Sequence, residues 1–311
     1  MRLSISVIIP TYNRAGYLSQ AIDCLLAQTR IPNEIIVVDD GSTDHTPDVL
    51  DRYGSTVEVI VQPDRMGPSA ARNIGLKRAS GDLIAFLDSD DFLPVTSIER
   101  RASILEANAD VAAAYGGALM IDLTGKNLGW FRPPPFPRGM IFHELAARPV
   151  FPIHSVMFRR KCLDAIGYFD ESLRLHEDFH FWARFGSVYS FEAIDEVLAY
   201  YRIHPETTII TKANVLVSEG IGVRERLFAL PAFDRLSQQR KSRLFSVHGT
   251  DHVLSGKRIE AWRWYLRAIR TSPGSIRPYG LMLLSLIGPR AFSFVATTRH
   301  RLIHRANVSY P

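Results

Sequence analysis

The chain has 311 residues, 46% of them hydrophobic and 22% charged, with a net charge of +5. This composition argues against disorder, and the length allows one large α/β domain with a smaller appendage, or two modest domains. Only two cysteines are present, Cys24 and Cys162, which disfavours a disulfide scaffold or a structural zinc and favours a cytoplasmic location. The apolar run after Met1 breaks at Pro10 and is too short for a signal peptide, and no segment reaches the roughly 18 uninterrupted apolar residues of a membrane span.

The first ninety residues alternate between apolar strands and amphipathic helices. We expect strands at 4–9, 34–39, 57–62 and 83–87, and helices at 17–28, 46–53 and 67–78. The strands show little alternation of apolar and polar residues, which is typical of strands buried on both faces of a parallel sheet. The pattern therefore predicts a doubly wound, mainly parallel sheet flanked by helices, whose ligands bind beyond the carboxyl ends of the strands.

After residue 90 the chain shows a mixed region of strands, helices and loops, and then a region of helices only. A helix is expected at 98–108, strands at 110–120, 153–158 and 191–201, a short helix at 161–166, and helical character from residue 178. The span 130–139 is rich in proline and is expected to form a loop over the site. From about residue 213 the pattern is helical only, at 215–230, 236–253, 258–269 and 276–287. We therefore predict a catalytic domain at 1–212 and a helical C-terminal region at 213–311.

Polar and acidic residues follow three of the expected strands. They are Pro10 to Tyr12 after the first strand, Asp39 and Asp40 after the second, and Asp88, Asp90 and Asp91 after the fourth. If strand geometry continues, Asp88 and Asp90 point the same way, and two carboxylates held together favour Mg2+ or Mn2+ rather than zinc. The alternative is a helix N-cap with an acidic first turn, formed by Asp90 or Asp91.

Other patterns narrow the class of protein. No GxGxxG or GxxxxGK[ST] follows the first strand, which disfavours a dinucleotide fold and a P-loop ATPase. Arginine dominates beyond Arg224, which indicates an anionic neighbour such as a phosphorylated substrate or a membrane surface. Nucleic acid is disfavoured because no aromatic platform accompanies these arginines. The apolar segment 279–287 lies among them and is expected either to pack on the main domain or to lie at a membrane interface.

Five short motifs occur in a fixed order along the chain. They are Ser6 to Asn13 (SVIIPTYN), Ile36 to Asp44 (IVVDDGSTD), Gly67 to Gly75 (GPSAARNIG), Gly81 to Asp91 (GDLIAFLDSDD), and Glu177-Asp178 followed by Trp182. Together they resemble the inverting family 2 glycosyltransferases of the GT-A fold, from roughly Ile5 to His204, with the helical tail outside the resemblance. The resemblance implies metal-dependent transfer of a sugar from a nucleotide-sugar, UDP- or GDP-linked, to a glycan or lipid-linked acceptor in polysaccharide or glycolipid synthesis. It also fits peripheral contact with the inner face of the membrane.

The resemblance assigns roles on the donor side of the site. Pro10, Tyr12, Asp40, Arg72 and Asp88 would contact the donor nucleotide, with Tyr12 near the base and Asp40 accepting from the uracil or ribose. The guanidinium of Arg72 suits both a base edge and a phosphate, and a solvated arginine on a helix surface is the alternative.

The resemblance also assigns the metal and the catalytic base. Asp90 would bind Mn2+ or Mg2+, which would neutralise the leaving nucleoside diphosphate, and His204 is either a further metal contact or a structural hydrogen-bonding group. An inverting transfer needs one base, which the resemblance places at Asp178, with Glu177 orienting the acceptor or the donor sugar. The alternative for this pair is an acidic N-cap before an amphipathic helix.

The acceptor side and two other functions remain open. His154, Trp182 and the arginines of the proline-rich span are candidates for acceptor contacts, and Trp182 would also pack beneath the helix of Asp178 and fix it. A sugar-nucleotide pyrophosphorylase is one alternative, although its Gly-rich basic signature does not follow the first strand. A nucleotide-sugar binding protein without catalysis is the other, although it would lack a base and Asp178 is present.

Overall fold

The computed structural model describes residues 2–205 and 213–287. The chain divides into two compact units, Met1–Thr211 and Lys212–Pro311, one residue before the boundary expected from the sequence. Residues 288–311 of the expected helical region lie outside the described residues. Within the described part, no helix combines the length and the apolar character that a membrane crossing requires.

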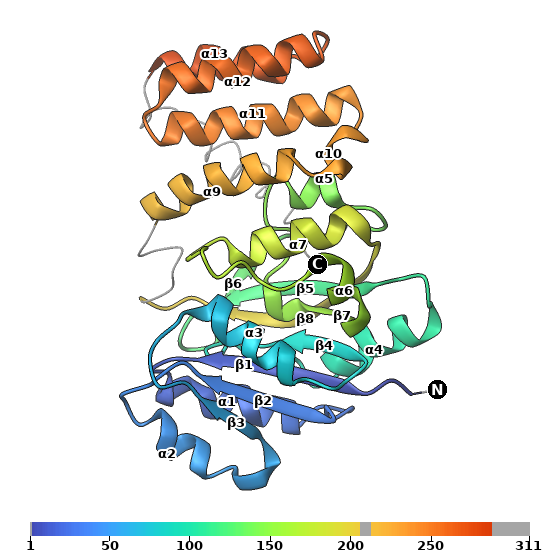
Figure 1. The fold of residues 1–311 in the computed structure, drawn as a ribbon, viewed down its shortest axis with the longest axis vertical. Coiled ribbons are helices and arrows are strands. Elements are labelled where there is room, and N and C mark those ends of the chain that lie inside the picture. Colours follow the sequence, from blue (N-terminus) through green and yellow to red (C-terminus); the bar gives the residue numbers. More distant parts are fainter. Residues whose placement is uncertain (1, 206–212, 288–311) are drawn as a thin grey trace. The chain divides into compact units, whose positions relative to one another are not determined.

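The first unit is built on an eight-stranded mixed sheet (Figure 1). Its strands are β1 (Ile5–Thr11), β2 (Glu34–Asp39), β3 (Glu58–Val61), β4 (Leu83–Phe86), β5 (Ala113–Ile121), β6 (Asn127–Trp130), β7 (Val156–Arg159) and β8 (Phe191–Arg202). The order is β3-β2-β1-β4-β7-β5-β6, and β8 pairs with β5. The first four strands are mutually parallel, β7 is antiparallel to β4 and β5, and β8 is parallel to β5. This confirms the predicted sheet.

Helices follow the strands in the first ninety residues, as the alternation predicts, and further helices occur up to residue 188. They are α1 (Ala15–Leu26), α2 (Thr46–Asp51), α3 (Pro68–Arg78), α4 (Ser97–Ala107), α5 (Phe142–Leu145), α6 (Leu163–Ile166) and α7 (Glu177–Val188). The apolar face of α1, with Leu18, Ile22 and Leu25 at helical spacing, is buried against the sheet core. Helix α3 starts at Pro68, which suits the first helical position, after Gly67 with a φ of 98°.

The segment between β5 and α7 departs most from the prediction. Residues 127–130 form β6, a hairpin partner of β5, and Ile153–Ser155 is a single 3-10 turn before β7 rather than the start of a strand. The proline-rich span is anchored on β5 and β8. The Tyr115 hydroxyl donates to the Pro137 carbonyl at 2.6 Å, and Gly139 pairs with Phe191. These tertiary contacts have no local sequence signal.

The second unit is helical, as expected. It contains α9 (Ala213–Phe228), α10 (Pro231–Asp234), α11 (Gln238–Leu254), α12 (Arg258–Thr271) and α13 (Arg277–Leu284), followed by a 3-10 turn at Ser285–Ile287. A short turn through Gly256, with a φ of 76°, joins α11 to α12. The ring of Tyr265 on α12 is fully buried and lies so close to Gly249 on α11 that a Cβ there would be 2.7 Å from it. The two helices are therefore in close contact.

A pair of glycine substitutions tests the packing of α3. A Cβ at Gly75 would lie 2.4 Å from Cγ2 of Ile8 on β1, so Gly75→Ala is expected to lower the free energy of unfolding by about 1–3 kcal/mol through overpacking. The control is Gly222→Ala in α9, where an added Cβ meets no heavy atom of the described residues within 4 Å, apart from its chain neighbours and its own helix backbone. Helix propensity should contribute about 0.5–1 kcal/mol of stability there. Urea unfolding measures both changes, and an unchanged midpoint for Gly75→Ala would contradict the tight contact.

Candidate active site

The carboxyl ends of β1, β2 and β4 meet at one edge of the sheet because these strands are parallel neighbours. Asp39, the last residue of β2, lies in register with Thr11 of β1, and the Asp40 N–H donates to the Thr11 carbonyl at 2.9 Å. On the other side of β1, the Leu87 N–H donates to the Ile8 carbonyl at 3.0 Å. The acidic residues after β2 and after β4 therefore emerge on the same edge.

The three acids after β4 form a turn rather than a continued strand. β4 ends at Phe86, and the Asp91 N–H donates to the Asp88 carbonyl at 3.0 Å. Asp88 and Asp90 were expected to point the same way only if the strand continued through them, and the strand ends before Asp88. The turn leaves the side chains of Asp88 and Asp90 about a quarter exposed, at 26% and 25%, whereas Asp91 is buried.

Asp90 contacts a histidine and an arginine from distant parts of the chain. Its Oδ2 lies 3.1 Å from Nε2 of His204, which follows β8, and 3.5 Å from Nε of Arg14, which precedes α1. Burial acts to raise the pKa of Asp90, but the hydrogen bond from His204 and the charge of Arg14 outweigh it and hold the pKa below its ordinary value. Asp90 is therefore ionised at neutral pH.

Asp91 and His154 form a buried contact behind this turn. The Arg202 N–H donates to Asp91 Oδ1 at 2.7 Å, and Asp91 Oδ2 lies 3.2 Å from Nδ1 of His154. Burial and the charges of Asp90 and Asp88 raise the pKa of Asp91 well above its ordinary value, and burial lowers the pKa of His154 to about 4. His154 has no exposed surface and stacks on Tyr201, so this structure does not present the ring to an acceptor.

The edge of the sheet offers a donor set for a divalent cation. One ligand atom each of Asp88, Asp91 and His154 lie within 4.8 Å of one another. Asp91 Oδ2 and both ring nitrogens of His154 are buried and have no hydrogen bond within the described residues. Mainly carboxylate oxygens suit Mg2+ or Mn2+, so the residues fit such an ion. The sequence motifs indicate Asp90 and His204 for this role, whereas the contact of Asp91 with His154 has no signal in the sequence.

Arg72 joins the acidic turn to the start of α7. Its Nη2 donates to Asp88 Oδ1 at 2.8 Å and its Nη1 donates to Glu177 Oε1 at 2.8 Å. The side chain is 6% exposed, so it is not a solvated surface arginine. Burial opposes the charge of Arg72, but Asp88 and Glu177 together raise its pKa above the ordinary value. The neighbouring Asn73 donates to the Phe169 carbonyl at 3.0 Å and so fixes the loop before α7.

Glu177 and Asp178 form the first turn of α7. Asp178 Oδ1 accepts from the N–H of Phe179 at 2.6 Å, and Glu177 Oε1 is held by Arg72. Burial raises the pKa of Glu177 to about 7 and also raises the pKa of Asp178, with Arg72 acting in the opposite direction on both. An acidic first turn also suits a helix N-terminus, so the capping interpretation and a chemical role are compatible here.

Trp182 lies one turn further along α7, in the hydrophobic core. It is 2% exposed, and its ring meets Phe151 and Phe158 edge to face at centroid distances of 5.6 Å each. This packing fixes α7, as expected, but leaves no face of Trp182 for the expected acceptor contact. The arginine at the end of the proline-rich span is also engaged: Arg138 forms ion pairs with Glu192 and Asp195 at 2.8 and 2.9 Å.

The residues expected to contact a nucleotide lie at the ends of β1 and β2. Asp40 is buried, and its two oxygens accept from the N–H groups of Met66 at 2.8 Å and Gly67 at 2.7 Å, which fixes the entry to α3. The ring of Tyr12 is half-buried, and the guanidinium carbon of Arg65 lies 4.0 Å from its centroid. Pro10 in β1 is also half-buried.

Sequence reasoning missed Tyr201, which lies among the acids of the site. Burial raises the pKa of this phenol, and the charges of Asp91, Asp88, Asp90 and Asp178 raise it further. All four carboxylates are therefore close enough to act on this phenol, which stays protonated at neutral pH. In the sequence, Tyr201 is the last residue of the expected strand 191–201, and no local pattern distinguishes it from its neighbours.

The class of protein follows from the fold and the site. The acidic turn lies where the parallel strands β1, β2 and β4 end, and Arg72 bridges it to the acidic first turn of α7. This arrangement is that of a glycosyltransferase of the GT-A type. The chain belongs to glycosyl transferase family 2, whose model matches residues 6–167. It is 34% identical over 225 residues to an uncharacterised glycosyltransferase of Rickettsia typhi, a match that spans 68% of each chain.

Solved structures share the fold, among them the following two. One is Staphylococcus aureus TarS 1-349 in complex with UDP-GlcNAc, with a TM-score of 0.67 and 18% identity, covering 96% of this chain and 92% of that one. The other is the mannosyltransferase PcManGT from Pyrobaculum calidifontis in complex with GDP-Man and Mn2+, with a TM-score of 0.60 and 20% identity, covering 98% and 86%. The protein is therefore an enzyme, a family 2 glycosyltransferase of the GT-A type.

Proposed function

We propose that this enzyme is an inverting, metal-dependent glycosyltransferase that moves a sugar from a nucleoside-diphosphate-sugar to an acceptor hydroxyl in polysaccharide or glycolipid synthesis. One observation carries the proposal. Arg72 forms one ion pair with Asp88, which follows β4 in the chain, and another with Glu177 at the start of α7, each at 2.8 Å. A donor group on the acidic turn and a base on α7 would therefore share one site.

The donor would lie between the ends of β1, β2 and β4 and the start of α3. Pro10, Tyr12 and Asp40 would surround the nucleoside, and the base would stack on the Tyr12 face that Arg65 covers, at a cost of about 1 kcal/mol for the lost contact. Arg72 Nε and Glu177 Oε2 are buried without a hydrogen-bond partner in the described structure, so both have capacity for a ligand. The solved relatives bound to UDP-GlcNAc and to GDP-Man support a UDP- or GDP-linked donor.

Asp90 and His204 would hold Mn2+ or Mg2+ beside Asp88, because the Asp90 side chain is 25% exposed. Asp91 and His154 also lie close to Asp88 but are buried, and they would support the acidic turn from the core side. The lowered pKa of Asp90, which results from the His204 hydrogen bond and the Arg14 charge against the effect of burial, keeps this carboxylate ionised and ready to bind a cation. When bound, the ion would neutralise the charge of the leaving nucleoside diphosphate. The Mn2+ in the complex of PcManGT supports a metal of this kind.

Asp178 would remove the proton of the acceptor hydroxyl. Its Oδ1 accepts from the Phe179 N–H, so the proton would go to Oδ2. Burial raises the pKa of Asp178, which makes it a stronger base than an exposed aspartate. The hydroxyl oxygen forms the new bond to the anomeric carbon as the bond to the diphosphate breaks, so the configuration inverts. Glu177, held by Arg72, would orient a sugar hydroxyl.

The acceptor would be a glycan or a lipid-linked glycan, with peripheral membrane contact through α13 and the turn after it. Exposed apolar side chains support this contact: Ile276 is 86% exposed, Leu283 68% and Leu286 53%. His154 and Trp182 would act from within the core by positioning the acidic turn and α7.

Product stereochemistry tests the proposal. The full chain is incubated with UDP-GlcNAc, UDP-glucose or GDP-mannose and a panel of glycan acceptors, with Mn2+, Mg2+ or a chelator. We expect nucleoside diphosphate release that needs the metal, and a β-linked product from an α-linked donor by proton NMR. A retained configuration, or full activity in chelator, would contradict it. Nucleoside triphosphate formed from donor and pyrophosphate would instead support a pyrophosphorylase.

A further inference from the structure

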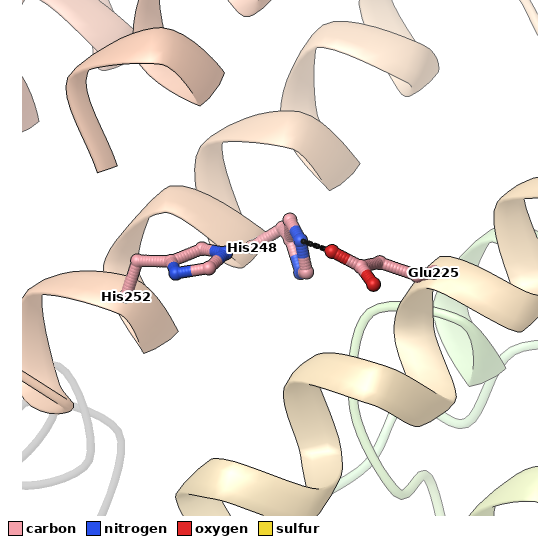
Figure 2. Close-up of side chains that lie close together, drawn as sticks. All are labelled: Glu225, His248 and His252. Carbon is pink, nitrogen blue, oxygen red and sulfur yellow. Dashed lines mark ion pairs between the residues drawn. The ribbon is translucent and has the colours of Figure 1, made fainter. Parts of the chain in front are cut away.

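Two histidines and a glutamate meet in the second unit, outside the residues of the transferase site. His248 and His252 lie one turn apart on α11, and Glu225 lies on α9 (Figure 2). Residues four apart share one face of a helix, so both rings can reach the same point. One ligand atom from each of the three residues lies within 4.8 Å of the others, and His248 Nε2 is 3.5 Å from Glu225 Oε1.

The two imidazoles are buried without hydrogen bonds. His248 is 0% exposed and His252 is 6% exposed, and none of their four ring nitrogens has a hydrogen-bond partner in the described part of the chain. A neutral imidazole has one donor and one acceptor, and burying them unpaired is costly. The rings of Phe228 and Trp264 meet His248 edge on, at 5.4 and 4.4 Å between centroids. Neither aromatic ring replaces the missing hydrogen-bond partners of the imidazole nitrogens.

The arginine next to Glu225 on α9 is already paired with another acid. The Nη2 of Arg224 lies 2.8 Å from Oδ2 of Asp251. Neutral imidazoles have the lone pairs that a metal ion needs, and a carboxylate is ionised for the same purpose.

We propose that Glu225, His248 and His252 form a zinc site that ties α9 to α11. Two imidazoles with one carboxylate form a ligand set that zinc uses, with the fourth position left for water. Bonds of about 2.0–2.2 Å in a tetrahedron hold the ligand atoms about 3.3–3.6 Å apart, so His248 and Glu225 are already spaced correctly at 3.5 Å. The other ligand atoms of the cluster also lie within 4.8 Å of one another. The Glu225 side chain is 53% exposed and gives the ion an entry path.

This site differs in chemistry from the acidic edge of the first unit. There the ligand atoms are mainly carboxylate oxygens, which suit Mg2+ or Mn2+, whereas two imidazoles favour zinc. Zinc in the second unit would join α9 to α11, the helix on which α12 packs. Its expected effect is to stabilise the contact between α9 and α11, independently of the proposed transfer reaction.

Zinc binding to the full chain tests the proposal. The protein is purified without a polyhistidine tag, stripped with a chelator and titrated with zinc against a chromogenic chelator, in excess Mg2+ to occupy the acidic edge. We expect the parent protein to bind one zinc ion per chain tightly. Glu225→Gln and His252→Gln should each bind zinc about tenfold more weakly, or worse. His45→Gln is the control, because that side chain is 90% exposed, and it should bind zinc as the parent does.

A second measurement separates loss of a ligand from loss of the fold. Glu225→Gln alters an exposed side chain, so its circular dichroism should match that of the parent. Zinc should raise the melting temperature of the parent by several degrees but leave that of Glu225→Gln unchanged. Equal zinc affinity in the parent and both variants would overturn the proposal, as would millimolar binding in all of them.

Discussion

Asp178→Asn is expected to lower the turnover number by about 10²–10⁴-fold, because an amide cannot accept the acceptor proton. The substitution keeps the shape of the side chain. Its Oδ1 can still accept from the Phe179 N–H, a bond of 2.6 Å in the structure, so the start of α7 should stay in place. Donor affinity should therefore change by less than about twofold. Turnover with saturating donor and acceptor, together with donor binding by calorimetry, measures both.

The matched control is Asp164→Asn, at an exposed position in the first turn of α6. The same chemical change there should leave turnover and donor binding unaltered. If Asp178→Asn kept half of the parental turnover, another group would be the base. A loss of donor binding equal to the loss of turnover would instead indicate that Asp178 positions the donor.

The sequence predicts the sheet and the strand ends well because both depend on local patterns. Continuous apolar runs such as residues 35–38 mark buried parallel strands, and parallel strands necessarily bring their carboxyl ends to one edge. Asp88 and Asp178 were named from short motifs, and Arg72 connects them in the structure through Asp88 and Glu177.

The contacts that the sequence did not predict join residues with no shared local pattern. Asp91 meets His154 because β4 and β7 are neighbours, and His154 lies in the turn that leads into β7. Tyr201 lies near the acids because the preceding residue, Tyr200, pairs with Phe92, which directly follows the acidic turn. The same holds in the second unit, where the spacing of His248 and His252 is visible in the sequence but the approach of Glu225 is not. Such contacts depend on how elements pack.

Arg72→Leu is expected to lower the free energy of unfolding by about 3 kcal/mol and to abolish measurable transfer. It leaves Glu177 buried without its cation, and removing one partner of a buried ion pair costs about 3–5 kcal/mol. The lower end applies because Asp88, the other partner, is 26% exposed and regains water. Arg78→Leu is the control on the same helix: Arg78 is 55% exposed, so losing its pair with Glu58 should cost less than about 1 kcal/mol.

The loss in Arg72→Leu should also depend on pH, with a sign that follows from Glu177. Burial raises the pKa of Glu177 to about 7, against the lowering effect of Arg72, so removal of Arg72 raises it further. A carboxyl whose pKa is higher in the folded than in the unfolded state favours folding when protonated, and this stability is lost as pH rises through the folded value. The destabilisation by Arg72→Leu should therefore be largest at pH 8 and shrink towards pH 5. Urea unfolding across this range measures it, and a destabilisation that grows as pH falls would contradict the ion pair with Glu177.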